Sequence, residues 1–182
     1  LPQLCAAALL CSGAALAIPA AWMPAKAALA QLLLEHSFET SLAAGTSAKP
    51  WPWADITTMG RLTVDRLGVS DIVLAGASGE AMAFGPAEFP TRLNRRLTLL
   101  AAHRDSHFAW MRNLEEGDIV SLQRIDGSTA RYRVTHMQTV KWDRFAQPAQ
   151  LHRETLLLAT CYPFDAGKRG PLRRVAIAQR IA

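Results

Sequence analysis

Hydrophobic and polar positions follow three successive patterns along the chain. Residues 1–25 carry no charged side chain and are mostly apolar. From Lys26 to about Leu42, alanines and leucines are mixed with Gln and Glu at a spacing that predicts a helix. After Asp55 the sequence consists of short apolar runs separated by turn-forming residues, which is typical of strands joined by tight turns. The chain is therefore expected to join an apolar N-terminal helix to a β-rich domain.

The N-terminal run is longer than the roughly 18 apolar residues that indicate a membrane span. We interpret residues 1–25 as a transmembrane signal anchor, because the run is long for the core of a cleaved signal peptide. The alternative is a signal peptide cleaved after the small-residue pattern Ala28-Leu29-Ala30. A buried helix of a cytosolic protein is disfavoured, because few globular helices of this length lack a charge. Both favoured interpretations place the remainder outside the cytoplasm.

Residues 26–50 are interpreted as a helical stalk and linker. The helical pattern breaks at Gly45–Pro52, where Gly, Ser and two prolines occur together. This break is the predicted domain boundary, so residues 51–182 form the predicted globular domain. Its length suits a single domain.

Strand-like runs dominate the domain. They cover residues 61–67, 71–76, 97–102, 118–125, 130–140, 155–160 and 174–181. Asp126-Gly127 is a hairpin signal between two of these runs, and residues 106–114 have the pattern of a helical turn. Seven or eight short strands with few helices predict a mainly β domain, either a closed barrel or a sandwich.

The formal charge is +5, supplied by arginines scattered along the chain. These arginines do not gather with aromatic residues into a nucleic-acid-binding motif, so we expect a mildly basic, solvated surface and no nucleic-acid partner. No metal-ligand spacing is present, and no acidic cluster indicates a calcium site. We expect neither a metal nor another cofactor.

Three cysteines do not suggest a disulfide framework. Cys5 and Cys11 lie in the apolar N-terminal run, which leaves Cys161 as the single thiol of the predicted domain. It ends a strand-length apolar run and precedes Pro163, where a strand cannot easily continue. Cys161 is a candidate nucleophile, although a lone cysteine is more often a small buried hydrophobic residue.

Two further positions carry chemistry that a cysteine nucleophile needs. His103 follows the apolar run 97–102 and can exchange a proton near neutral pH, and His107 lies four residues later. The pair Arg173-Arg174 opens the last strand, where a guanidinium could stabilise a thiolate or an oxyanion. Each alone has a structural or solvated alternative. Together they form a set of nucleophile, base and electrophile.

The order and spacing of these elements resemble those of sortases. The run Leu157-Leu158-Ala159-Thr160-Cys161 is similar to the TLxTC signature of that family. Arg173 lies twelve residues past Cys161, a spacing typical of the family, and Val175 and Ile177 follow it in the family's register. For this reason we prefer Arg173 over Arg174. The resemblance spans residues 51–180.

The resemblance implies an eight-stranded sortase β-barrel with short helices. Segments 49–56, 76–86 and 103–108 look like the dedicated sortases of Gram-negative proteobacteria, so the chain is expected in the inner membrane with its catalytic domain facing the periplasm. The implied substrate is a partner protein with a C-terminal LPxTG-like sorting signal, and the acceptor amine is left open. One departure is Ala102, where family members usually carry Gly.

Residue roles follow from the same resemblance. Cys161 attacks the carbonyl between Thr and Gly of the sorting signal, His103 serves as general acid and base, and Arg173 stabilises the oxyanion. Thr160 is expected to orient the substrate or Arg173. Asp105 either fixes the His103 ring or caps the turn that follows it.

Two other functions stay open on the sequence. A periplasmic L,D-transpeptidase acting on peptidoglycan would also use Cys and His, but the surroundings of Cys161 lack the Ser/His–Gly-type motif of that family. A membrane-tethered barrel that only binds a partner would leave Cys161 unreactive.

Overall fold

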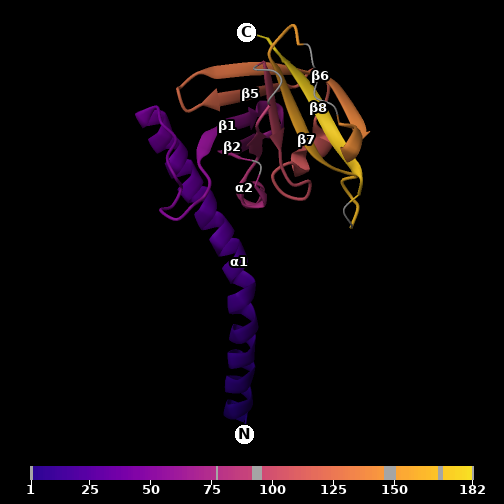
Figure 1. Ribbon diagram of the computed structural model, residues 1–182. Helices are drawn as coiled ribbons and strands as arrows, with labels where there is room; N and C mark the ends of the chain where they lie inside the picture. The colour runs from indigo at the N-terminus through magenta and orange to yellow at the C-terminus, as the bar shows by residue number, and fades with distance from the viewer. Residues whose placement is uncertain (1, 77, 92–95, 146–150, 168–169, 182) are drawn as a thin grey trace.

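The computed structural model describes residues 2–76, 78–91, 96–145, 151–167 and 170–181, and for residues 2–21 it describes the backbone alone. Within these ranges a long helix leads into a closed barrel of eight strands (Figure 1). The strands are β1 (Thr58–Val64), β2 (Val69–Ala75), β3 (Ala87–Phe89), β4 (Leu97–Ala101), β5 (Ile119–Arg124), β6 (Thr129–Lys141), β7 (Thr155–Tyr162) and β8 (Leu172–Arg180). The helices are α1 (Pro2–Ala44) and α2 (Gly79–Phe84), with 3₁₀ turns η1 (Asp65–Leu67), η2 (Ala109–Asn113) and η3 (Trp142–Arg144).

The barrel closes in the order β1-β2-β3-β4-β7-β8-β6-β5, with β5 pairing back onto β1. Most neighbours are antiparallel, but β2 pairs with β3 and β4 pairs with β7 in parallel. The β4–β7 pairing joins segments that are more than fifty residues apart in the sequence, and it brings the ends of the two runs that precede His103 and Cys161 to the same edge of the barrel.

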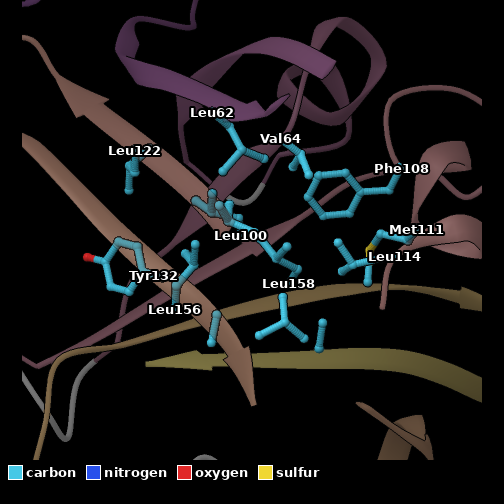
Figure 2. Close-up of a cluster of buried hydrophobic side chains, with 14 of the residues drawn as sticks. Leu62, Val64, Leu100, Phe108, Met111, Leu114, Leu122, Tyr132, Leu156 and Leu158 are labelled. Carbon is cyan, nitrogen blue, oxygen red and sulfur yellow. The ribbon is translucent and has the colours of Figure 1, made fainter. Parts of the chain in front are cut away.

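The barrel interior holds the main hydrophobic core. Side chains alternate between the two faces of each strand, so Leu156 and Leu158 of β7 point inward with Leu100 of β4 and Leu62 of β1, as Figure 2 shows. Phe108 and Met111, from the turn around η2, are also fully buried in this core. The helical turn expected at residues 106–114 therefore packs on its apolar side into the core of the barrel.

A second apolar cluster lies on the outer face of β4, β7 and β8. Leu99, Leu157 and Val175 are buried there, and Phe145 and Leu151 pack against them. The three neighbouring strands therefore carry apolar residues on both faces, which explains why their sequences are nearly continuous apolar runs.

The C-terminal part of α1 is packed onto the barrel. Leu34 and Phe38 are fully buried against Ile56, Ile72 and Leu74. Within the predicted helical stalk and linker, residues 26–50, the helix therefore supplies part of the core. In Figure 1 its remaining length extends away from the barrel.

Polar contacts reinforce the docking of α1. The buried Ser41 hydroxyl lies 2.9 Å from that of Thr58 at the start of β1, and the amide of Ala48 donates to Ser41 at 2.8 Å. The Arg61 guanidinium lies 4.7 Å from the centroid of the Phe38 ring and pairs with Glu35 and Glu39 of the helix. These contacts hold the helix in one register on β1.

The predicted anchor, residues 1–25, falls largely on residues 1–21, whose side chains lie outside the described set. Among the residues that the structure describes, no helix offers a stretch long and apolar enough to cross a membrane. The anchor stays a prediction.

The strands expected from the sequence are present, and the barrel alternative to the sandwich is confirmed. The Asp126-Gly127 hairpin joins β5 to β6, with Gly127 in the left-handed region at a φ of 82°. Two short elements were not expected. They are β3 and α2, the latter capped by the Ser78 hydroxyl, which accepts from the amide of Ala81 at 3.1 Å.

Candidate active site

Cys161 and Arg173 are direct partners in the antiparallel ladder of β7 and β8. Directly opposed residues of an antiparallel pair carry their side chains on the same face, with Cβ atoms about 4.5–5.5 Å apart. Leu157 and Ala159 place this face of β7 on the outside of the barrel. Cys161 and Arg173 therefore share the outer face at the end of β7, and both are partly exposed.

His103 reaches the same place from β4. In the parallel ladder Ala101 is the partner of Ala159, and the amide of Ala102 continues the pairing by donating to the carbonyl of Ala159 at 3.4 Å. His103 lies two residues beyond Ala101, just as Cys161 lies two residues beyond Ala159. The exposed His103 thus follows the end of β4 beside the end of β7, and β7 stands between β4 and β8.

The register separates Arg173 from Arg174. Arg174 is the ladder partner of Thr160, which faces the barrel interior, and its guanidinium lies 3.4 Å from the Thr139 hydroxyl of β6. Arg173 shares the face of Cys161, and its Nη1 donates to the carbonyls of Gly170 and Leu172 at 3.0 and 2.9 Å. Strand alternation thus favours Arg173, the residue preferred from the sequence.

The expectation for Thr160 needs a correction. Its hydroxyl donates to the carbonyl of Ala102 at 2.8 Å, and the side chain is buried. It faces the interior of the barrel, on the side of β7 opposite to Arg173, and it is only 2% exposed, so it cannot orient that arginine or a substrate directly. This hydrogen bond instead connects Thr160, which precedes Cys161, to Ala102, which precedes His103.

The expectation for Asp105 is corrected as well. Its carboxylate accepts two hydrogen bonds from the neighbouring Arg104, from Nε at 2.8 Å and from Nη2 at 3.1 Å. Among the hydrogen bonds that the structure describes, none joins Asp105 to His103, and none caps the following turn. The partner of the Asp105 carboxylate is thus Arg104, and the positive charge of His103 also contributes to its lowered pKa.

Arg104 was not singled out from the sequence, yet it is a central contact of the site. Its side chain is only 7% exposed. Nη1 donates to the carbonyl of Pro163 at 2.6 Å, and Nη2 donates to the carbonyl of Ala166 at 2.7 Å. Arg104 therefore connects the turn after β4 to the loop after Cys161. The one signal in the sequence was its position next to His103.

The charges of this pair stabilise each other. Hydrogen bonding to Arg104 lowers the pKa of the Asp105 carboxyl below its usual value, against a smaller opposing effect of desolvation. The hydrogen bond to Asp105 raises the pKa of Arg104, desolvation lowers it, and negative charge on Asp105, Cys161 and Asp165 raises it further. The hydrogen bond to the carbonyl of Pro163, two residues past Cys161, brings the positive charge of Arg104 close to the end of β7.

A second arginine touches the loop between β7 and β8 from η2. The guanidinium of Arg112 lies 5.6 Å from the centroid of the Phe164 ring, and Nη1 lies 3.5 Å from the Asp165 carboxylate. Both charged side chains are well exposed, so this contact is weaker than that of Arg104.

His107, the other histidine of this segment, contacts a different group. Its Nδ1 lies 3.3 Å from the carboxylate of Asp71 on β2, which also accepts from the indole of Trp110 at 3.3 Å. The structure thus gives His107 a partner on β2 and leaves His103 beside β7. In the described part of the chain, no cluster of three or more His, Cys, Asp or Glu could hold a metal ion.

Comparison with known proteins gives one consistent family. The model of the sortase domain matches residues 62–181, which span β1 to β8 and include all the site residues above. A comparison with curated protein sequences gives no match.

Solved structures of similar fold are sortases by their titles. The pilus-related sortase C of Group B Streptococcus is 23% identical with a TM-score of 0.56, over 69% of this chain and 68% of that one. Sortase A from Corynebacterium diphtheriae is 14% identical with a TM-score of 0.60, over 71% of this chain and 63% of that one. Sortase C-1 from Actinomyces oris is 21% identical with a TM-score of 0.57, over 68% and 73%. At these identities the likeness shows the fold.

Proposed function

Since the chain belongs to the sortase family of cysteine transpeptidases, we propose that Cys161, His103 and Arg173 carry out its transpeptidation. The observation that supports this assignment is the alignment of three strand ends. Cys161 and Arg173 are ladder partners on the outer face, and His103 follows β4 beside them. A nucleophile, a proton-transfer group and a cation thus meet at one exposed edge of the barrel.

In the first half-reaction Cys161 passes its proton to His103, and its sulfur attacks the carbonyl carbon of the scissile peptide bond. The C–S bond forms, and the negative charge on the carbonyl oxygen is stabilised by Arg173. The C–N bond then breaks, His103 gives a proton to the departing amine, and a thioacyl enzyme remains.

The second half-reaction regenerates the thiol. A primary amine attacks the thioacyl carbon and His103 takes up the proton of that amine. The C–S bond then breaks as the new amide forms, and His103 passes the proton to the departing sulfur. If water attacks in place of the amine, the product is a free carboxylate and the reaction is hydrolysis.

We propose an LPxTG-like C-terminal sorting signal as the substrate, cleaved between Thr and Gly. The test is to incubate the full chain with an LPxTG-type peptide and, separately, with a peptidoglycan stem peptide, each with an added amine. Cleavage of the sorting peptide alone supports the proposal. Cleavage of the stem peptide alone would favour an L,D-transpeptidase-like activity. A reaction with neither peptide in a folded protein would call for the C-terminal peptide of a genomically neighbouring protein.

We further propose that residues 1–25 anchor the chain in the inner membrane of a Gram-negative cell, with the barrel in the periplasm. Support comes from the uncharged N-terminal run and from the exposed Trp22 followed by Lys26, residue types that favour the membrane–water interface. Alkaline extraction of membranes should leave the full chain in the pellet and release a variant that lacks residues 1–25. Release of both would contradict the anchor.

A further inference from the structure

Arg104 occupies an unusual position for an arginine. Only 7% of its side chain is exposed, although it lies in a turn between β4 and η2 at the edge of the barrel. Charged side chains are seldom this buried unless their hydrogen-bonding groups are paired. The hydrogen-bond partners of Arg104 therefore indicate which parts of the structure this buried side chain holds together.

The partners come from both sides of the site. On its own turn, Arg104 binds the Asp105 carboxylate through Nε at 2.8 Å and Nη2 at 3.1 Å. Across the site, it donates to the carbonyls of Pro163 and Ala166, which are 59 and 62 residues away in the sequence. Arg104, the residue after His103, is thus hydrogen-bonded to the loop that begins two residues after Cys161.

This bridge sits next to the one made by Thr160. Thr160, the residue before Cys161, donates its hydroxyl hydrogen bond to the carbonyl of Ala102, the residue before His103. Arg104, the residue after His103, reaches the chain on the other side of Cys161. Hydrogen bonds between the two segments therefore lie on both sides of His103 and Cys161. That of Thr160 lies before the two residues, and those of Arg104 lie after them.

We infer that Arg104 is a positioning residue that holds the turn of His103 and the loop of Cys161 at a fixed spacing, and that Asp105 offsets its charge at the thiol. This inference rests on the proposed roles of Cys161 and His103. The guanidinium is suited to the task because its planar fork can serve a carboxylate and two carbonyls at once. A lysine carries the same charge but cannot reproduce this geometry.

The charge argument gives a sign for each substitution. A cation near a thiol favours the thiolate, which is the reactive form, and a nearby carboxylate disfavours it. Removal of Arg104 should therefore slow the alkylation of Cys161 at pH 7, and removal of the Asp105 charge should speed it. Among the described residues, the ionisable groups nearest the end of β7 are as follows: His103, Arg104 and Asp105 on the turn after β4, Arg112 on η2, Tyr162 on β7, Asp165 on the β7–β8 loop and Arg173 on β8.

The experiment measures two quantities on the full chain. The first is the rate of Cys161 alkylation by iodoacetamide, a neutral reagent, as a function of pH. The second is kcat and KM for the sorting peptide. Arg104→Met should lower the alkylation rate at pH 7 about three- to tenfold through the lost charge. It should lower kcat about 10- to 100-fold through misplacement of the catalytic groups, with KM changed much less.

Two further variants separate position from charge. Arg104→Lys keeps the charge, so alkylation should stay near the wild-type rate while kcat still falls. Asp105→Asn should raise the alkylation rate at pH 7, opposite to Arg104→Met. Arg112→Met is the matched control, because it removes an arginine that touches the same loop through an exposed contact. In Arg112→Met, kcat should stay within about twofold of wild type.

Several outcomes would overturn the inference. They are an unchanged kcat in Arg104→Lys, changes of the same sign in the alkylation rates of Arg104→Met and Asp105→Asn, or equal effects of Arg104→Met and Arg112→Met on kcat. Should Arg104→Met fail to fold, the Lys and Asn variants decide the question. Alkylation needs no substrate, so a wild-type protein that cleaves no sorting peptide would count against the proposed substrate, while the alkylation profiles would still test Arg104.

Discussion

Arg173 lies directly opposite Cys161 in the ladder between β7 and β8, on the outer face of the barrel. This relationship is fixed by backbone hydrogen bonding along eight paired positions, from Thr155–Gln179 to Tyr162–Leu172. A shift of one residue would turn every side chain of β8 to the other face. The register therefore selects which of two neighbouring arginines can act on the thiol.

The first prediction compares these two arginines. Arg173→Gln should lower kcat/KM about 10²- to 10³-fold, because it removes the cation that we propose stabilises the developing oxyanion. Arg174→Gln is the control on the opposite face, beside Thr139, and should stay within a few-fold of wild type. Steady-state kinetics with the sorting peptide measure both. A larger loss in Arg174→Gln would show that the wrong arginine has been assigned.

The second prediction concerns the link between β7 and β4. Thr160→Val keeps the shape of the side chain but removes the hydroxyl that donates to Ala102. It should cost about 1–2 kcal/mol of unfolding free energy, because a buried carbonyl loses its partner. It should also lower kcat, because the turn of His103 is less firmly placed. Thr160→Ser keeps the hydroxyl and should retain most of the activity. Equal activity of the Val and Ser variants would exclude this positioning role.

The third prediction tests whether α1 belongs to the folded domain. Phe38→Ala removes a fully buried ring and should cost about 3–5 kcal/mol in denaturant unfolding. Leu32→Ala changes a side chain of the same helix that is 68% exposed, and should alter stability by less than about 0.5 kcal/mol. If Phe38→Ala is as mild as Leu32→Ala, the helix is only a tether to the barrel.

The fourth prediction concerns the ion pair between Arg66 of η1 and Asp118, next to β5. Asp118 accepts from Arg66 Nε at 2.5 Å and from Nη2 at 2.7 Å, and also from the amide of Glu115 at 2.8 Å. These bonds lower the pKa of Asp118, led by the one to Arg66, while desolvation opposes them. A depressed carboxyl pKa stabilises the folded state above the ordinary pKa of Asp, and this stability is lost as the pH falls through the depressed value.

Asp118→Asn should therefore lower the unfolding free energy by about 1–2 kcal/mol at neutral pH, a modest value because Arg66 is half exposed. The difference from wild type should shrink as the pH falls below about 4. Glu115→Gln serves as control, since this exposed carboxylate lies 4.0 Å from the same arginine. A pH-independent difference for Asp118→Asn would indicate that packing, and not the charge, is lost.

Much of the barrel follows from local patterns. The alternation in β5 and β6 and the Asp126-Gly127 turn are visible in the sequence, because one face of each strand must be buried and the turn needs a residue with positive φ. By contrast, β3 spans only three residues, too few for a period to be recognised. Its existence depends on pairing with β2 and β4, which are brought together by the closure of the barrel.

The candidate site also combines residues that local sequence patterns indicate with residues whose contacts depend on the folded structure. Cys161 and Arg173 were chosen from strand ends and from a spacing of twelve residues that resembles the spacing in sortases, and their catalytic roles stay predictions. Arg104 could not, because a charged residue in a polar turn is expected to be solvated, and its burial depends on carbonyl groups from a distant loop. The contacts of Thr160 and Asp105 could not be anticipated for a related reason. Their nearest partners, Ala102 and Arg104, are set by strand pairing and side-chain geometry.

The most direct test of the account is the mass of the full chain after incubation with an LPxTG-type peptide. We predict an adduct on Cys161 equal to the peptide segment that ends at Thr, formed in wild type and absent in Cys161→Ala. An added amine should discharge the adduct and yield a product that carries the amine. Cleavage without dependence on Cys161, or a folded wild-type protein that forms no adduct with any sorting peptide, including that of a neighbouring gene, would contradict the account.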